Sequence, residues 1–187
     1  VERETKGAEI VICLDVSNSM LAQDYSPDRL SRAKLAISKL VDRLQGDRIG
    51  LVIFAGTSFV QLPVTTDYVS AKMFLSSIDT RSVPVQGTAI GDAIRTAAKS
   101  FSAQSEKSRA IIVITDGENH EDDAAGAARE ANETGIKVYT IGVGTPDGQP
   151  LKIDGELLKD KDGRIVVSRL DEPALKKIAA AGGGAYV

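Results

Sequence analysis

Short, continuous apolar runs constrain the fold of this chain more than any other feature of its sequence. Runs of Ile, Val and Leu without alternation are typical of parallel strands that are covered on both faces. The stretch at residues 58–62 alternates instead and closely follows the run at 49–54, as an antiparallel edge strand would. The sequence therefore predicts five strands, at residues 10–14, 49–54, 58–62, 110–114 and 137–141.

Amphipathic helical patterns fill the intervals between these runs. Ser26-Pro27 predicts a helix start, with the serine as cap and the proline at the first helical position, and the apolar face continues to Leu44. Apolar or small residues at helical spacing predict further helices near residues 67–78, 90–101 and 124–131. A last helix is expected to begin at Asp171 and to stop at the glycine run 182–184, before a strand-like end.

Strands that alternate with helices predict an α/β fold: a doubly wound, mostly parallel open sheet with one antiparallel edge strand and helices on both faces. Three Asp-Gly pairs between residues 147 and 163 are tight-turn signals. They predict a β-hairpin insertion near 147–168, with strands near 151–158 and 164–167. The length of 187 residues fits one domain, 1–187, and the charged start and strand-like end suggest excision from a longer protein.

Composition excludes several classes of function. The net charge of −3 offers no basic surface for nucleic acid or for an anionic membrane. No apolar run approaches the roughly 20 residues that a membrane span needs, and the N-terminus lacks a signal-peptide pattern. The single cysteine, Cys13, lies inside an apolar run and is interpreted as core packing, which leaves the redox compartment open.

Oxygen-bearing side chains follow two of the predicted strands and precede one predicted helix. Asp15, Ser17 and Ser19 occupy alternate positions directly after the first strand, and Asp116 follows the fourth. Thr88 precedes the helix near residue 90. Because ligands of open α/β sheets bind at the carboxyl ends of strands, we expect these five side chains to converge there.

Carboxylates and hydroxyls together suit a hard divalent cation, Mg²⁺ or else Mn²⁺ or Ca²⁺. Zinc is disfavoured because the sequence has no Cys/His cluster and His120 is its only histidine. Asp15 and Asp116 would neutralise one divalent ion, whereas the three hydroxyls add no charge. An open coordination position would therefore attract an acidic residue from a protein partner.

The combined pattern resembles the metal-ion-dependent adhesion site of von Willebrand factor A domains. It consists of Asp15-x-Ser17-x-Ser19-Met20, then Thr88, then Thr115-Asp116-Gly117. The resemblance implies direct metal ligation by Ser17, Ser19 and Thr88, and ligation by the two aspartates directly or through water. We expect Asn18, Gly117, Glu118 and His120 to form the rim that meets a partner.

Within that family, segments 30–34, 47–50 and 87–91 resemble the bacterial aerotolerance (Bat) membrane proteins. This resemblance implies a domain that faces the periplasm and is anchored in the bacterial inner membrane by segments outside this sequence. It implies as partners a MoxR-type AAA+ ATPase and other Bat-type proteins. Two functions therefore remain open. The domain is either a simple adhesion or scaffold module, or the von Willebrand factor A component of an ATPase-driven chaperone or chelatase-like machine.

Local structure offers a simpler interpretation of each residue. The segment from Asp15 to Ser19 could be a turn that satisfies its own backbone, Thr88 a helix cap, and Asp116 part of an Asp-Gly turn. The occurrence of all five together favours a metal site. His120 lies in an acidic stretch, for which a solvated loop is the alternative interpretation.

A phosphoryl-transfer enzyme is the competing class of function. Phosphatases that use an aspartate at the end of the first strand need a second aspartate two residues later, where this chain has Ser17. A phosphate-binding loop and a recognisable catalytic triad are also missing from the sequence. We therefore expect a binding module, not an enzyme.

Overall fold

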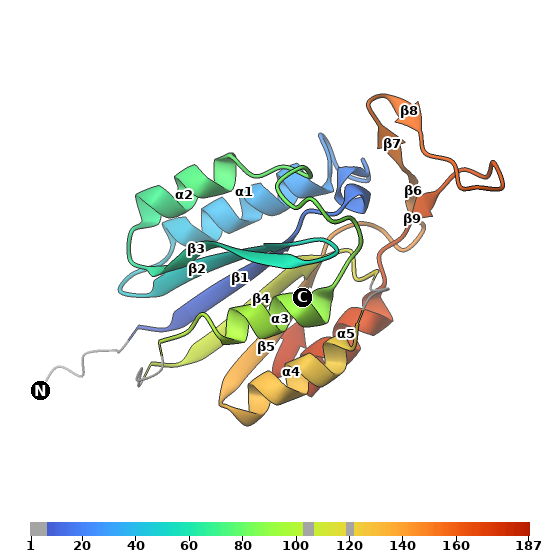
Figure 1. The fold of residues 1–187 in the computed structure, drawn as a ribbon. Helices are drawn as coiled ribbons and strands as arrows, with labels where there is room; N and C mark the ends of the chain where they lie inside the picture. Colours follow the sequence, from blue (N-terminus) through green and yellow to red (C-terminus); the bar gives the residue numbers. More distant parts are fainter. Residues whose placement is uncertain (1–6, 103–106, 119–121) are drawn as a thin grey trace, which may run out of the picture.

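The computed structural model describes residues 7–102, 107–118 and 122–187 (Figure 1). Its main sheet has the strand order β10-β5-β4-β1-β2-β3, in which β3 is antiparallel and the other strands are parallel. The five predicted strands and their directions are confirmed. The bounds are β1 Glu9–Asp15, β2 Arg48–Phe54, β3 Ser58–Thr65, β4 Arg109–Thr115, β5 Ile136–Gly142 and β10 Gly183–Tyr186.

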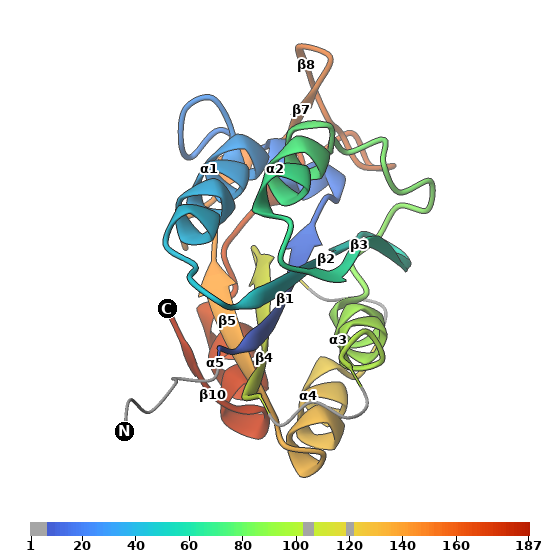
Figure 2. The same ribbon diagram turned by 90° about the vertical axis from the view of Figure 1, so that its left-hand side faces the viewer.

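Helices cover both faces of this sheet, as the sequence predicts (Figure 2). In β1, Val11 and Cys13 pack into the core beneath one set of helices, whereas Ile12 and Leu14 pack into the core on the opposite face. All four side chains are fully buried, which explains the continuous apolar run. The first face carries α3 Ile90–Ala98, α4 Ala124–Glu133 and α5 Glu172–Ala181, and the second carries α1 Arg29–Asp42 and α2 Tyr68–Ser76.

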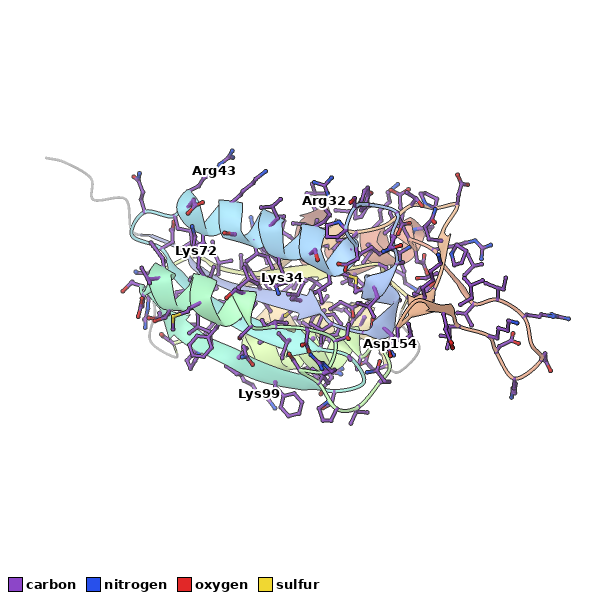
Figure 3. All side chains as sticks on the ribbon, turned by 90° about the horizontal axis from the view of Figure 1, so that it is seen from above. Arg32, Lys34, Arg43, Lys72, Lys99 and Asp154 are labelled. Carbon is purple, nitrogen blue, oxygen red and sulfur yellow. The ribbon has the colours of Figure 1, made fainter. Side chains whose placement is uncertain are left out.

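Helix α1 starts later than its sequence pattern predicts. Pro27 lies before the helix, and the cap is Asp28, whose carboxylate accepts a hydrogen bond from the Ser31 amide at 2.7 Å. The prediction of a start at Ser26-Pro27 was wrong because an aspartate one residue further on satisfies the free amides of the first turn. The side chain of Lys34 extends from α1 and donates to the carbonyl of Ile78, just after α2, at 2.7 Å (Figure 3).

The predicted insertion at 147–168 is present but has more turns than expected. β6 Gln149–Pro150 pairs with β9 Val167–Ser168, and β7 Lys152–Ile153 pairs with β8 Glu156–Leu157. The expected strand at 151–158 is therefore a small hairpin in its own right. It turns at Asp154-Gly155, where both φ angles are positive (53° and 81°), as a tight two-residue turn requires.

The arrangement of the sheet gathers several loops at one end of the molecule. β1, β2, β4 and β5 are parallel and in register, so their carboxyl ends meet at the same edge. The insertion projects from this edge (Figure 1). Within the described part of the chain, no helix has the length and apolar character needed to cross a membrane.

Candidate metal centre

The two aspartates of the predicted site leave the sheet side by side. Leu14 of β1 pairs with Ile114 of β4, so Asp15 lies level with Thr115, and Asp116 is the next residue of the adjacent strand. Both side chains are fully buried. The hydroxyl of Thr115 donates to Oδ2 of Asp15 at 2.7 Å, which links the two strand ends directly.

The loop after β1 brings its two serines together. The amide of Ser17 donates to Oδ1 of Asp15 at 2.8 Å, so the aspartate fixes the loop that follows it. The hydroxyls of Ser17 and Ser19 lie 3.0 Å apart, and both residues are buried. Met20 belongs to the short helix η1 (Asn18–Leu21) and anchors it with a fully buried side chain.

Thr88 reaches the same edge from another loop. Ala55 follows β2, the neighbour of β1, and its carbonyl accepts a hydrogen bond from the amide of Ala89 at 2.7 Å. Thr88 itself is buried. The structure thus brings all five predicted residues to the carboxyl edge of β1, β2 and β4.

Asp122 connects the loop after β4 to the helix that follows Thr88. Its carboxylate accepts hydrogen bonds from the amides of Gly91 at 2.9 Å and Asp92 at 2.6 Å, in the first turn of α3. A methyl group at Gly91 would lie 2.8 Å from that carboxylate, so glycine permits the close approach. Asp122 therefore holds the Thr88 and Asp116 loops in register.

Burial and nearby negative charge raise the pKa of both aspartates. Burial is the main cause for Asp15, although hydrogen bonds from Ser17 and Thr115 oppose it. Burial and then the charge of Asp15 raise the pKa of Asp116 to about 7. The charge of Asp15 disfavours ionisation of Asp116, and a divalent cation bound by both would relieve that repulsion.

The atoms that could bind a metal ion at this site are all oxygens. Among the described residues, no three or more His, Cys, Asp or Glu side chains form a cluster able to hold a metal ion. A cation bound by Asp15 and Asp116 would need the hydroxyls of Ser17, Ser19 and Thr88 as well. Carboxylates and hydroxyls suit a hard cation such as Mg²⁺, so the residues fit the predicted group.

The predicted rim residues have different environments. Asn18 is partly exposed beside the serines. Gly117 adopts a φ of 84°, and a side chain there would lie 2.8 Å from the carbonyl of Asp171. Glu118 accepts a hydrogen bond from the amide of Arg169 at 3.0 Å, which connects it to the end of the insertion. His120 lies outside the described residues.

Sequence reasoning missed a buried arginine next to the site. The side chain of Arg29 is fully buried and donates to both carboxylate oxygens of Asp24, at 2.5 and 3.0 Å. It also lies 3.3 Å from Oδ2 of Asp116. The available signal was helical spacing, because Arg29 stands one helical turn before Ala33 and two before Ile37 on the buried face of α1.

Comparison with known proteins gives one family. The sequence model described as von Willebrand factor type A domain matches residues 9–181. A UPF0353 protein of Nocardia farcinica is 32% identical over 201 residues, which cover 96% of this chain and 57% of that protein. The chain thus spans about half the length of the curated relatives it matches.

Two solved structures share the fold at higher identity. BatB of Bacteroides thetaiotaomicron is 52% identical with a TM-score of 0.94, over 97% of this chain and 89% of that one. An aerotolerance-related membrane protein of Bacteroides fragilis has the same identity and TM-score, over 97% and 90% of the two chains.

Proposed function

Because this chain belongs to the von Willebrand factor type A domain family, we propose that it is a divalent-cation-dependent protein-binding module of a bacterial membrane protein. The observation that carries the proposal is the buried pair Asp15 and Asp116, which stands beside the paired hydroxyls of Ser17 and Ser19. These residues, together with Thr88, would hold Mg²⁺, or else Mn²⁺ or Ca²⁺.

The charges of the site determine what kind of partner fits. The carboxylates of Asp15 and Asp116 would balance the two positive charges of the cation. Arg29 forms its ion pair with Asp24, which is not one of the proposed ligands. When bound, the cation would offer an exchangeable coordination position to an external carboxylate. The hydroxyl ligands orient that position without adding negative charge. An Asp or Glu of a protein partner is therefore the proposed final ligand.

Binding is favoured over catalysis by the residue types at the site. Ser17 stands where a phosphoryl-transfer enzyme of this topology would need a second aspartate. The sequence also shows neither a phosphate-binding loop nor a recognisable catalytic triad. We therefore propose a module that assembles proteins and has no turnover of its own.

The relatives suggest a setting for this module. A structural neighbour 52% identical to this chain is described as an aerotolerance-related membrane protein. We propose a domain exposed to the periplasm and held at the inner membrane by other parts of the protein. A MoxR-type ATPase and other Bat-type proteins are its candidate partners. A component of an ATPase-driven chaperone or chelatase-like machine would use the same metal site.

The test compares two buried carboxylates of one strand. Asp15→Asn keeps the size of the side chain but removes one of two neutralising charges, so Mn²⁺ or Mg²⁺ affinity should fall by at least about 100-fold, or roughly 2.7 kcal/mol. Glu9→Gln alters the equally buried acid at the opposite end of β1 and should leave affinity unchanged. Equal metal binding by parent and Asp15→Asn in titration calorimetry would contradict the assignment.

A further inference from the structure

The projecting part of the insertion lies next to the candidate metal centre. Strand β7 lies against η1, the turn that carries Ser19. Leu151, just before β7, is buried and anchors the start of the projection. In Figure 3, Asp154 at the turn after β7 lies toward the end of the molecule where the insertion projects, far from Arg43 and Lys72. A protein that reaches the metal would therefore meet the insertion as well.

One buried side chain fixes the base of the insertion relative to the metal ligands. Arg29 donates to the hydroxyl of Ser168 at 2.8 Å and to its carbonyl at 3.0 Å, while the same guanidinium contacts Asp116. Its partner Asp24 accepts hydrogen bonds from the amide and hydroxyl of Thr145, at 2.9 and 2.8 Å. Both ends of the insertion are thus attached to the group that touches a predicted ligand.

Close packing reinforces this attachment. A methyl group at Gly144 would lie 2.9 Å from the central carbon of the Arg29 guanidinium, so the backbone before the insertion rests directly on the arginine. Tyr25 donates to the carbonyl of the same glycine at 3.0 Å. An isolated two-stranded hairpin is marginally stable in water. The contacts of Arg29 and Tyr25 with Gly144 therefore stabilise the insertion against the rest of the domain.

The projecting segment exposes large apolar side chains. Leu157 is 41% exposed, Leu158 36% and Ile165 47%. Lys159 pairs with Ile165, and the amide of Val166 donates to the carbonyl of Leu158 at 2.9 Å, so Ile165 lies on the segment beside the one that carries Leu157 and Leu158. The exposed charges between residues 152 and 165 balance, with four basic and four acidic side chains. This segment therefore offers an apolar contact with no net attraction for a charged surface such as nucleic acid or anionic lipid.

We propose that residues 151–166 form the second half of the partner-binding surface, and that the partner is a protein segment whose metal-binding acid has large apolar neighbours. This inference rests on the proposed function, because the acid is the one that completes the coordination of the metal. The two halves recognise different features. The metal selects a carboxylate, and Leu157, Leu158 and Ile165 select the apolar side chains beside it.

The experiment uses a random peptide library as the probe. Peptides are selected on the immobilised protein in Mg²⁺ and eluted with a chelator. The selection is repeated on Leu157→Ser/Leu158→Ser/Ile165→Ser and on the control Val69→Ser/Met73→Ser, which removes two exposed apolar residues of α2. Mn²⁺ calorimetry verifies that both variants keep the metal affinity of the parent.

The parent and the control should enrich Asp or Glu flanked by large apolar residues. The triple variant should enrich the acid without the apolar neighbours, and a peptide selected on the parent should bind it roughly tenfold more weakly or worse. Identical enrichment by parent and triple variant would overturn this inference and leave the proposed function standing. Failure of every protein to enrich acidic peptides in a metal-dependent way would overturn both.

Discussion

At the scale of single residues, charge at the candidate centre is distributed over more groups than its five predicted members. Asp15 and Asp116 are its two acidic members, and Arg29 lies 3.3 Å from Oδ2 of Asp116. Because Asp24 binds Arg29 through both carboxylate oxygens, the arginine is largely neutralised within its own pair. The pair can therefore hold Asp116 in position without replacing the cation that the two buried aspartates need.

The Asp24–Arg29 pair predicts a defined pH dependence of stability. Burial alone would raise the pKa of Asp24, but hydrogen bonds from Arg29 and Thr145 outweigh it and lower the pKa below its ordinary value. The native state then binds fewer protons than the unfolded state in acid. The stabilisation is present above the usual aspartate pKa of about 4 and is lost as pH falls further. Asp24→Asn should destabilise the protein by about 3 kcal/mol at neutral pH, because the buried Arg29 loses the carboxylate that binds it through both oxygens.

Urea unfolding measured from neutral pH down to about pH 3 tests this. The difference between parent and Asp24→Asn should shrink in acid, because the parent loses the same ion pair there. Asp28→Asn is the control, since asparagine caps a helix about as well as aspartate and should change little. A difference between parent and Asp24→Asn that stays constant across the whole range would contradict the prediction.

The convergence of the five predicted residues could be foreseen, whereas the contribution of Arg29 could not. Asp15 and Asp116 end adjacent parallel strands, and strand topology alone brings such ends together. Arg29 contacts the site through Asp116, which is 87 positions away in the sequence, and it also binds Ser168, which is 139 positions away. No local pattern encodes a contact between a helix start and the end of an insertion, so spacing could indicate only that Arg29 is on the buried face.

At the scale of elements, the accuracy of prediction followed the strength of the local signal. The strand at Glu9–Asp15 was evident because burial on both faces leaves no polar position between Ile10 and Leu14. The start of α1 was placed too early because two capping signals, Ser26-Pro27 and Asp28, lie within three residues of each other. In the insertion, turn residues predicted the turn at Asp154-Gly155, but strands of two residues leave no periodicity to detect.

The contact of α5 with β5 depends on a residue without a side chain. Gly182 ends α5 with a φ of −85°, which alanine can adopt, so the constraint is steric. A methyl group there would lie 2.4 Å from Cβ of Val138, too close to be accommodated without movement of helix or strand. Gly182→Ala should therefore cost about 1–3 kcal/mol of stability.

Gly50 in β2 provides the comparison. A methyl group at that position would lie 3.2 Å from the nearest atom, the end of the Val64 side chain, which can shift slightly. Gly50→Ala should therefore cost less than Gly182→Ala in urea unfolding. The opposite order would mean that backbone freedom, not space, decides the use of glycine at these two positions.

At the scale of the whole molecule, the sheet separates two ends with different buried charges. At the amino end of β1, the acid Glu9 is fully buried, but Arg48 lies 3.3 Å away and the amide of Ser102 donates to it at 3.3 Å. At the carboxyl end, the described residues place a single arginine, Arg29, beside Asp116, and that arginine is shared with Asp24. The unbalanced end is therefore the one where the fold should gain stability from a cation.

This asymmetry predicts where and how much a metal stabilises the protein. A ligand that binds only the native state, supplied at about 100 times its dissociation constant, adds about 2.7 kcal/mol, and for a protein of this size that raises Tm by roughly 5–11 °C. Mg²⁺ should slow amide hydrogen exchange in η1 and in the segment after β4, because these loops carry the ligands. Exchange at the β1–β2 contact near Glu9 and Arg48 should change little. Asp15→Asn should abolish both the rise in Tm and the local protection. Protection spread evenly over both ends of the sheet, or retained in Asp15→Asn, would place the cation elsewhere.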